Sequence, residues 1–351
     1  MRAANKADVG ADADESGRRA DAAKRARRLA KAKAKSMPVV APVDGPKLER
    51  HVAAPLVAPA PRGGVLEVFQ QPYLLRLIVQ RQLAAMYAAS FLGLLWSYIQ
   101  PAMRFAVYYL VMGIILKMHA GFPAFAIHLF CGIVFVHYFS ETWSGGTRSI
   151  WQNRSLILKM RLPREIFPVA SMMVALYHTF PQVILLVFCC VITGWQVTWL
   201  GLAAGLLGMA ILMFFATAMA LLFSALNVFA RDVQNIVQTM LQFMHFLVPM
   251  MYPFSRIYEV HASHPWMYQI YMANPISEAV VLMQRFFWWG VVPASSRQGN
   301  HLIDPDTGKR TVEFPPDMWV RGLTMLAISM LLVFLAQRYF SRVEGRFPER
   351  M

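Results

Sequence analysis

The chain has 351 residues, of which 57% are hydrophobic and only 15% are charged. Soluble domains carry about a quarter charged residues, so this composition excludes a soluble globular protein. The formal net charge of +15 would suggest nucleic-acid binding in a soluble chain. In a membrane protein, basic loops on the cytoplasmic side explain much of that charge, and we expect no nucleic-acid partner.

Residues 1–62 are basic and Pro-rich, and we expect them to form a disordered tail and linker. Between Arg18 and Lys35 there are nine basic residues and one acidic residue. Aromatic residues are almost absent, so this segment has too little apolar surface to build a packed core. The alternative is a basic helix that lies on an anionic membrane surface.

The stretch from Leu74 to Leu95 predicts an N-terminal amphipathic helix in the cytoplasmic interface of the membrane. Its apolar residues are interrupted by polar ones, among them Arg76 and Arg81. Two arginines and the break at Gly93 argue against a membrane span, whereas a helix that lies in the interface tolerates them. Trp96 follows where interfacial aromatic residues are expected.

Hydropathy predicts six transmembrane helices, which makes the chain an all-α integral membrane protein. One crossing needs about 20 apolar residues, and the stretch from Ile166 to Ala230 contains no charged residue. The transmembrane domain should cover residues 63–342 and leave 343–351 as a cytoplasmic tail. The predicted spans are Ile99–Leu116, Phe122–Phe139, Ile166–Ile192, Thr198–Leu226, Ile236–Tyr252 and Met318–Gln337.

The distribution of Lys and Arg places both termini on the cytoplasmic side of an inner or plasma membrane. The second predicted loop and the C-terminal segment are basic, whereas the loops on the opposite side carry only Lys117. The long segment between the fifth and sixth spans is then extracytoplasmic. The basic residues of the two cytoplasmic segments are Arg148, Arg154, Lys159, Arg161, Arg164, Arg338, Arg342, Arg346 and Arg350.

The second cytoplasmic loop, from Asn153 to Pro168, predicts a short basic helix that ends before Pro163. A helix held at the membrane face can transmit motion from a soluble partner. Composition alone favours a simpler alternative, in which the arginines only keep the loop inside. In the next cytoplasmic corner, Arg231 and Asp232 are adjacent and cannot easily bond each other, so each needs another partner or solvent.

Prolines predict a gate-like turn after the fifth span. Pro249 and Pro253 bracket its end, and Asn274 and Pro275 follow. Proline frees backbone carbonyl groups, which is tolerated at membrane depth only against protein or a water-filled cavity. We therefore expect re-entrant helices between the fifth and sixth spans, with a plain exit loop as the alternative.

Arg104 is a candidate ligand for the phosphate of a lipid-linked substrate. It lies a few residues into the first span, and ionisable groups inside spans are functional candidates. The alternative is that its side chain extends to the nearby interface. Aromatic residues could line a sugar-conducting passage, although lipid or helix packing explains any single one. The aromatic candidates are Trp96, Tyr108, Tyr109, Phe243, Phe246 and Tyr252.

The sequence predicts no catalytic residue, metal site or bound cofactor in this chain. It contains no GxxxxGK[ST] phosphate-binding run, so any ATPase must be another chain. Cys131, Cys189 and Cys190 lie in apolar blocks and are expected to be buried. The histidines near the spans share no ligand spacing, and we expect them to pack and form hydrogen bonds. They are His128, His137, His178 and His245.

Several motifs together resemble ABC-2 type permeases, the membrane subunits of polysaccharide and polyol-phosphate exporters. No one of them is specific, but they occur in the order of that family between Leu66 and Arg342. The chain has Met86-Tyr87-Ala88 where many relatives have Arg-Tyr-Arg. The matching residues are Arg81, Ser90–Trp96, Pro101, Leu162–Pro168, Asn227, Arg231, Asp232, Pro249, Tyr252, Pro253, Asn274 and Pro275.

The resemblance implies a homodimer that assembles with two copies of a separate subunit carrying ATP and Mg. It also implies export of a lipid-linked polymer, such as O-antigen or a teichoic acid. By analogy, the interfacial helix and the second cytoplasmic loop contact the ATPase, and the segment after Pro253 matches outer gate helices. The ATPase-coupling candidates are Arg81, Ser155, Leu156, Lys159, Arg161, Arg164, Glu165, Arg231 and Asp232.

Two other functions stay open from the residues alone. An ATP-independent secondary transporter would be supported by repeated halves, which are not apparent. A membrane-embedded glycan-modifying transferase would need acidic or His residues gathered at one membrane face. The outer segment does hold such residues, without a recognised catalytic spacing: Glu259, His261, His264 and Glu278.

Overall fold

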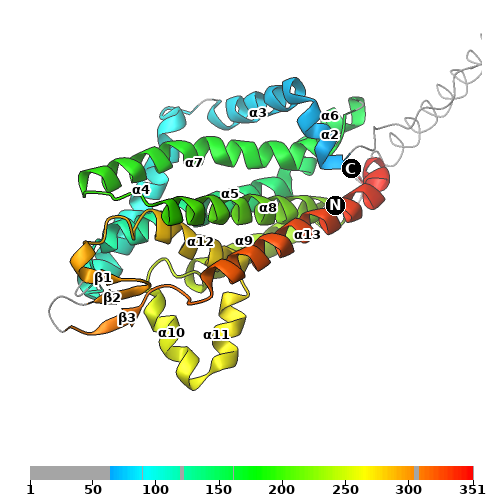
Figure 1. The fold of residues 1–351 in the computed structure, drawn as a ribbon. Coiled ribbons are helices and arrows are strands. Elements are labelled where there is room, and N and C mark those ends of the chain that lie inside the picture. The colour runs from blue at the N-terminus through cyan, green and yellow to red at the C-terminus, as the bar shows by residue number, and fades with distance from the viewer. Residues whose placement is uncertain (1–63, 89, 119–121, 161, 304–307, 351) are drawn as a thin grey trace, which may run out of the picture. The chain divides into compact units, whose positions relative to one another are not determined.

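The computed structural model describes residues 64–88, 90–118, 122–160, 162–303 and 308–350. The predicted N-terminal tail and Arg161 lie outside these residues. The described part is built mainly from helices, which confirms the predicted class (Figure 1).

Four long helices form the centre of the fold and run side by side (Figure 1). Helix α5 (Phe125–Gln152) packs between α7 (Ile166–Ile192) and α8 (Trp199–Phe229), and α13 (Met318–Val343) packs on α8. Together with a segment at Trp96–Ile115, the described residues contain five helices long and apolar enough to cross a membrane. These correspond to predicted spans one, two, three, four and six.

Helix α5 is longer than the predicted second span, which ended at Phe139. It continues to Gln152 because its polar residues face other helices rather than a loop. Thr142, Ser144, Thr147 and Ser149 are all buried. Asn227 of α8 donates from Nδ2 to the Thr147 carbonyl at 3.0 Å. Interhelical hydrogen bonds of this kind are common in membrane bundles, but a hydropathy window counts their residues as loop.

The N-terminal helices lie against the bundle rather than within it. Helix α2 (Gly64–Gln70) leads into α3 (Pro72–Tyr87), which packs on α7 and buries Leu75 and Ile78. The predicted interfacial helix reached Leu95, and that boundary is wrong. A turn with Gly93 at φ +49° and the 3₁₀ turn η1 (Gly93–Leu95) follow α3. The helix itself ends at Tyr87, because Ala88 leaves the helical conformation, and the positive φ at Gly93 favours glycine there.

The first span consists of α4 (Trp96–Tyr108) and the π-helical segment η2 (Tyr109–Ile115). Only 11% of the residues in the most apolar stretch of this span are buried. Most of its apolar surface is therefore available to lipid or to another protein.

The fifth predicted span is represented by α9 (Val233–Leu247), which has 15 residues. Such a helix is about 22 Å long and is shorter than a hydrocarbon core of about 30 Å. A sixth crossing therefore stays a prediction.

The chain after α9 is irregular, and its free carbonyl groups are satisfied by side chains. The Tyr252 hydroxyl donates to the Phe246 carbonyl at 2.7 Å. Ser277 Oγ donates to Leu247 O at 3.1 Å, and Gln284 Nε2 donates to Pro249 O at 2.8 Å. Irregular backbone at membrane depth would require such partners, and a re-entrant turn stays a prediction.

Three helices and a small sheet form the segment between α9 and α13. Helices α10 (Phe254–Ser263) and α11 (Pro265–Met272) pair, and α12 (Pro275–Phe286) packs on α8. After the 3₁₀ turn η3 (Ala294–Ser296), three antiparallel strands follow in the order β1-β2-β3, with His301 opposite Val312. The sequence analysis did not predict this sheet. The strands are β1 (Arg297–Gln298), β2 (His301–Ile303) and β3 (Arg310–Val312).

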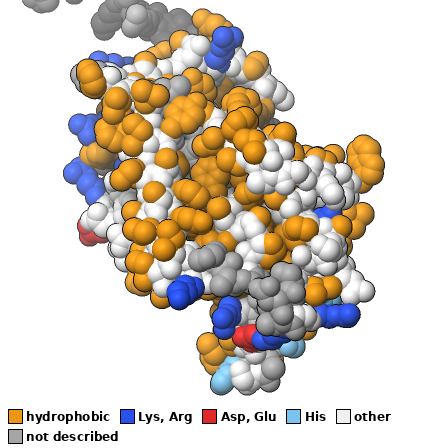
Figure 2. Space-filling view, turned by 90° about the vertical axis from the view of Figure 1, so that its left-hand side faces the viewer, with side chains coloured by type: hydrophobic (Ala, Val, Ile, Leu, Met, Phe, Trp, Pro, Cys, Tyr) orange, Lys and Arg blue, Asp and Glu red, His pale blue; other side chains and the backbone are white. Residues whose placement is uncertain are grey.

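Figure 2 views the side of the molecule that lies at the left of Figure 1. Apolar side chains cover most of its upper part, while charged and His side chains gather toward its lower part, at the height of α10 and α11.

The basic loops lie at the end of the long helices that points away from the side seen in Figure 2. Helix α6 (Arg154–Lys159) confirms the predicted short helix before Pro163, and it lies near α2 and the C-terminus (Figure 1). The predicted C-terminal tail begins at the end of α13. It forms η4 (Glu344–Arg346) and α14 (Phe347–Arg350), and Phe347 is fully buried.

Helices α5 and α8 approach closely at Gly146, so one added methyl group there should lower the stability of the protein. A Cβ placed on Gly146 of α5 would lie 2.4 Å from Ala220 Cβ of α8. We expect Gly146→Ala to lower the free energy of unfolding by about 1–3 kcal/mol, because overpacking forces the backbones apart. The thermal unfolding midpoint in detergent measures this.

Gly145→Ala is the matched control, since its Cβ would lie 3.6 Å from Ser171 Cβ, an ordinary contact. Equal midpoints for the two variants would contradict the close α5–α8 approach.

Candidate functional site

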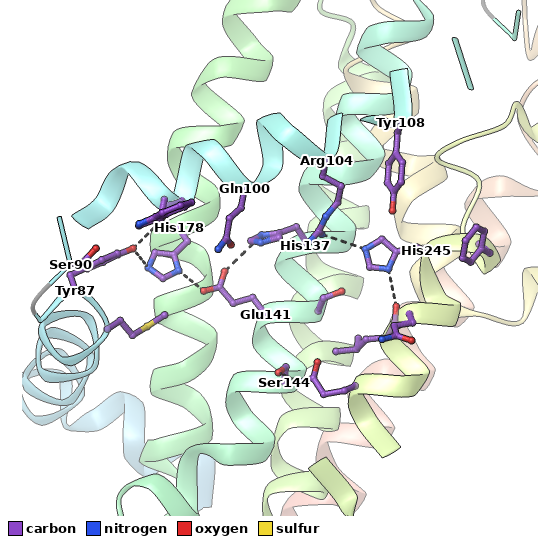
Figure 3. Close-up of a pocket in the computed structure, with 18 residues that line it drawn as sticks. Tyr87, Ser90, Gln100, Arg104, Tyr108, His137, Glu141, Ser144, His178 and His245 are labelled. Carbon is purple, nitrogen blue, oxygen red and sulfur yellow. Dashed lines mark hydrogen bonds and ion pairs between the residues drawn. The ribbon is translucent and has the colours of Figure 1, made fainter. Parts of the chain in front are cut away.

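A polar cavity of about 880 Å³ lies among α3, α4, α5, α7 and α9 (Figure 3). We call it the central cavity. Four of the predicted substrate residues line it: Trp96, Arg104, Tyr108 and Phe246. The other lining residues are Met86, Tyr87, Ser90, Ser97, Gln100, His137, Ser140, Glu141, Ser144, His178, Gln238, Leu241, Gln242 and His245.

Arg104 extends into the central cavity and contacts His245 of α9 (Figure 3). Its Nη1 lies 3.4 Å from His245 Nε2. His245 Nδ1 donates to the Leu241 carbonyl at 2.8 Å, which leaves Nε2 as the acceptor for the guanidinium. The interaction therefore fixes the His245 tautomer and orients the Arg104 side chain across the cavity.

Arg104 lies within α4, in the first span, as the sequence predicted. Arg104 lies about 12 Å along α4 from Trp96. Its partner His245 lies near the far end of α9 from the corner at Arg231. The guanidinium therefore points toward His245 in the cavity rather than toward the nearby interface.

A chain of hydrogen bonds crosses the other side of the cavity (Figure 3). Tyr87 Oη lies 2.8 Å from both Ser97 Oγ and His178 Nε2. His178 Nδ1 contacts Glu141 Oε1, and Glu141 Oε2 lies 3.9 Å from His137 Nδ1. With Glu141 ionised, the donors run in one direction, from Ser97 to Tyr87, then to His178, and then to the carboxylate. This chain joins α3, α4, α5 and α7.

Pro101 explains one further interhelical contact at the cavity wall. Proline has no N–H, so the Ser97 carbonyl four residues earlier lacks its helical donor. Gln182 of α7 replaces that donor, with Nε2 at 3.2 Å from Ser97 O. Pro101 thus links α4 to α7 at the level of the Tyr87 hydrogen bonds.

The remaining substrate candidates lie outside the central cavity. Tyr109 stacks on Phe105, with ring centroids 5.7 Å apart. Phe243 is exposed on α9. Tyr252 lies in the irregular turn, and its hydroxyl oxygen is 3.0 Å from that of Tyr271. Any contact of these three residues with a substrate stays a prediction.

The gate candidates form the connections around that turn. Pro249 is buried, and Pro253 precedes α10 with extended backbone. Asn274 caps α12, because its Oδ1 accepts from Ile276 N at 3.1 Å, and Pro275 occupies the first helical position. The Asn-Pro pair is therefore a helix start.

The coupling candidates divide into an exposed and a buried set. Arg81, Ser155 and Lys159 are exposed, and Leu156 is half-buried. Arg231 and Asp232 are exposed too, and the Arg231 guanidinium lies 4.0 Å from the Trp151 ring centroid. These residues remain accessible to a partner at the basic end of the bundle.

Arg164 and Glu165 are buried and contact the C-terminal part of the chain. Arg164 donates from Nη1 to the Glu344 carbonyl, and its guanidinium lies 5.8 Å from the Phe347 ring centroid. Gln337 Nε2 donates to Glu165 Oε1 at 2.9 Å. Burial lowers the pKa of Arg164, while the nearby Glu344 and Glu165 oppose that shift. The two residues hold the loop in place rather than present it to a partner.

Glu141 was not predicted as a site residue, whereas the hydrogen bonds of His178 and His245 agree with the role expected of the histidines. His137, His178 and His245 line the cavity, whereas His128 packs against Phe122 and Trp288. A usable signal was present, since Glu141 follows His137 by four residues and both therefore lie on one helix face. It was missed because Glu141 fell in a predicted loop.

The chemistry available in the cavity is recognition rather than catalysis. The Arg104 guanidinium suits an anionic group, and the amides and hydroxyls suit sugar hydroxyl groups. Within the described residues there is no group of three His, Cys, Asp or Glu that could hold a metal ion. The acidic and His residues proposed for a transferase do not gather either, since Glu278 is buried in α12 while Glu259 is exposed on α10.

The Arg164 contacts predict that this side chain docks the C-terminal segment. Arg164→Ala should expose residues 344–350, because it removes a charge-assisted hydrogen bond worth about 1.5–3 kcal/mol. The rate of C-terminal trimming by carboxypeptidase measures the exposure. Arg342→Ala, which removes an exposed arginine, is the control, and equal rates for both variants would refute the docking role.

Comparisons with known proteins agree with the membrane architecture. A family model described as ABC-2 type transporter matches residues 73–288. The chain is 30% identical over 198 residues to the O-antigen export system permease protein RfbA of Myxococcus xanthus, covering 56% of this chain and 75% of that protein. It is 25% identical over 223 residues to the protein of the same name from Klebsiella pneumoniae, covering 62% and 82%.

Proposed function

The chain belongs to the ABC-2 type transporter family, and from this premise we propose that it exports a lipid-linked cell-surface polysaccharide. It is a permease and works with a separate ATP-binding subunit. The chain aligns with most of the length of the two proteins named O-antigen export permeases. This similarity supports a substrate of that class. The observation that carries the proposal is the polar central cavity around Arg104.

The contents of the central cavity suit both parts of such a substrate. Arg104 offers a guanidinium that can bind a phosphate bidentately. Trp96, Tyr87 and Tyr108 supply aromatic rings, and Gln100 and Gln242 supply amide groups for sugar hydroxyls. The lipid phosphate would meet Arg104 while the sugar units pass along the polar wall.

A homodimer would complete the passage. The exposed surface of α4 and η2 is apolar and adjoins the central cavity. A second copy against that surface would enclose the cavity between two protomers. Lipid would then contact the remaining apolar surfaces.

We place the chain in the cytoplasmic membrane with both termini in the cytoplasm. The support is that the basic loops, α2 and the C-terminus share one end of the long helices (Figure 1). Basic segments are retained on the cytoplasmic side. The segment from α10 to β3 then faces outward.

Tyr87 offers a route by which the ATPase could act on the cavity. It is the last residue of α3, and its hydroxyl bonds Ser97 of α4 and His178 of α7. If two copies of the ATP-binding subunit press on α3 and α6, the displacement reaches the cavity wall through this residue.

Replacement of Arg104 tests the proposal. Arg104→Ala should reduce export of surface polysaccharide at least about tenfold, since a charge-assisted contact contributes about 1.5–3 kcal/mol. Copurification with the ATP-binding subunit should survive, because Arg104 lies inside the cavity. Immunoblotting of surface polysaccharide and affinity capture measure the two outcomes.

Arg256→Ala removes the same charge from the exposed surface of α10 and should export normally. Normal export by Arg104→Ala would remove Arg104 from the substrate site. Failure of the wild-type chain to capture an ATP-binding subunit would contradict the permease assignment.

A further inference from the structure

A second cavity of about 420 Å³ lies among α3, α5 and α7, on the other side of Glu141 from the central cavity. We call it the α3 cavity. It shares only Met86 and Glu141 with the central cavity. Its other lining residues are Arg81, Gln82, Ala85, Gly145, Arg148, Gln152, Asn153, Ser171 and Val174.

Two arginines on facing helices dominate the charge of the α3 cavity. Arg81 comes from α3 and Arg148 from α5. Arg148 Nε is buried and has no hydrogen-bond partner among the described residues. Arg81 Nη1 lies 3.4 Å from Asn153 Oδ1, a long hydrogen bond to a neutral group. The cavity thus presents two guanidinium groups, and one buried donor, Arg148 Nε, has no partner among the described residues.

The single carboxylate in the wall does not neutralise these arginines. Glu141 Oε1 bonds His178, and its Oε2 lies toward His137. Gln82, Gln152, Asn153 and Ser171 are neutral. Leaving the buried Arg148 Nε without a partner is costly, and two arginines face a single carboxylate in the wall, so the composition favours an anionic ligand. Planar guanidinium groups from two sides match the oxygen atoms of a phosphate.

The position of the α3 cavity indicates where that phosphate comes from. Arg148 lies about 6 Å along α5 from its end at Gln152, where α6 and the other basic residues begin. Helix α3 exposes Tyr73, Leu77 and Met86, as a helix that lies in a membrane interface does. The cavity therefore lies at the level of lipid headgroups.

We propose that the α3 cavity binds the phosphate group of an anionic membrane lipid between Arg81 and Arg148. Ala85, Met86 and Val174 supply the apolar part of its wall, against which the glycerol or first acyl carbons of the lipid lie. The site is separate from Arg104, and binding does not depend on which polymer is exported. Its failure would therefore leave the proposed function standing.

Native mass spectrometry of the purified full-length chain tests the site. The probes are dioleoyl phosphatidic acid and, separately, inorganic pyrophosphate. The wild-type chain should retain phosphatidic acid, and the Arg81→Gln, Arg148→Gln double variant should bind it at least about tenfold more weakly. Arg338→Gln, which removes an exposed arginine of α13, should bind like the wild type.

A second variant separates loss of binding from loss of folding. Ala85→Phe fills the cavity, keeps both guanidinium groups and should also lose the lipid, while thermal unfolding reports whether each variant is folded. Retention of phosphatidic acid by both folded variants would overturn the proposal. Binding of pyrophosphate as tight as that of the lipid would overturn the membrane-lipid source and assign the site to a soluble phosphate.

Discussion

The arrangement of the helices around the central cavity depends on polar contacts that cross from one element to the next. A bilayer offers no water to an unpaired carbonyl or guanidinium group. Arg104 is oriented by His245, the carbonyl freed by Pro101 accepts from Gln182, and the turn after α9 is held by side chains from outside that helix. Each of these contacts joins two elements, so together they determine how the helices are arranged around the central cavity.

The same polar contacts connect the two ends of the molecule. Tyr87 joins the interfacial helix to the cavity, and Glu141 forms a wall common to the central and α3 cavities. At the basic end, Arg164 and Glu165 attach the loop that contains α6 to the C-terminal segment. Helix α3 and the loop around α6 are thus each attached to the bundle by side-chain hydrogen bonds.

Hydropathy and charge were sufficient to predict five long helices, the short helix before Pro163 and the clustering of basic loops at one end, because lipid imposes these features on composition. They were insufficient where polar residues face protein. The C-terminal half of α5 was assigned to a loop, so Glu141 was missed. The interfacial helix was extended to Leu95, because its end at Tyr87 falls before Ala88, a residue type that does not mark a helix end. Arg104 was identified from its charge alone, but its orientation toward His245 depends on the packing of α4 and α9, which no local pattern encodes.

Thiol accessibility tests the central claim most directly, since a thiol reacts as the thiolate and ionises in water but not in hydrocarbon. In a chain whose three native cysteines are replaced by alanine, Gln100→Cys would face the central cavity and Phe188→Cys would lie on an exposed apolar surface of α7. In membranes, a charged methanethiosulfonate reagent should modify Gln100→Cys readily and Phe188→Cys at least about tenfold more slowly. Equal protection of both positions would contradict a water-accessible passage around Arg104.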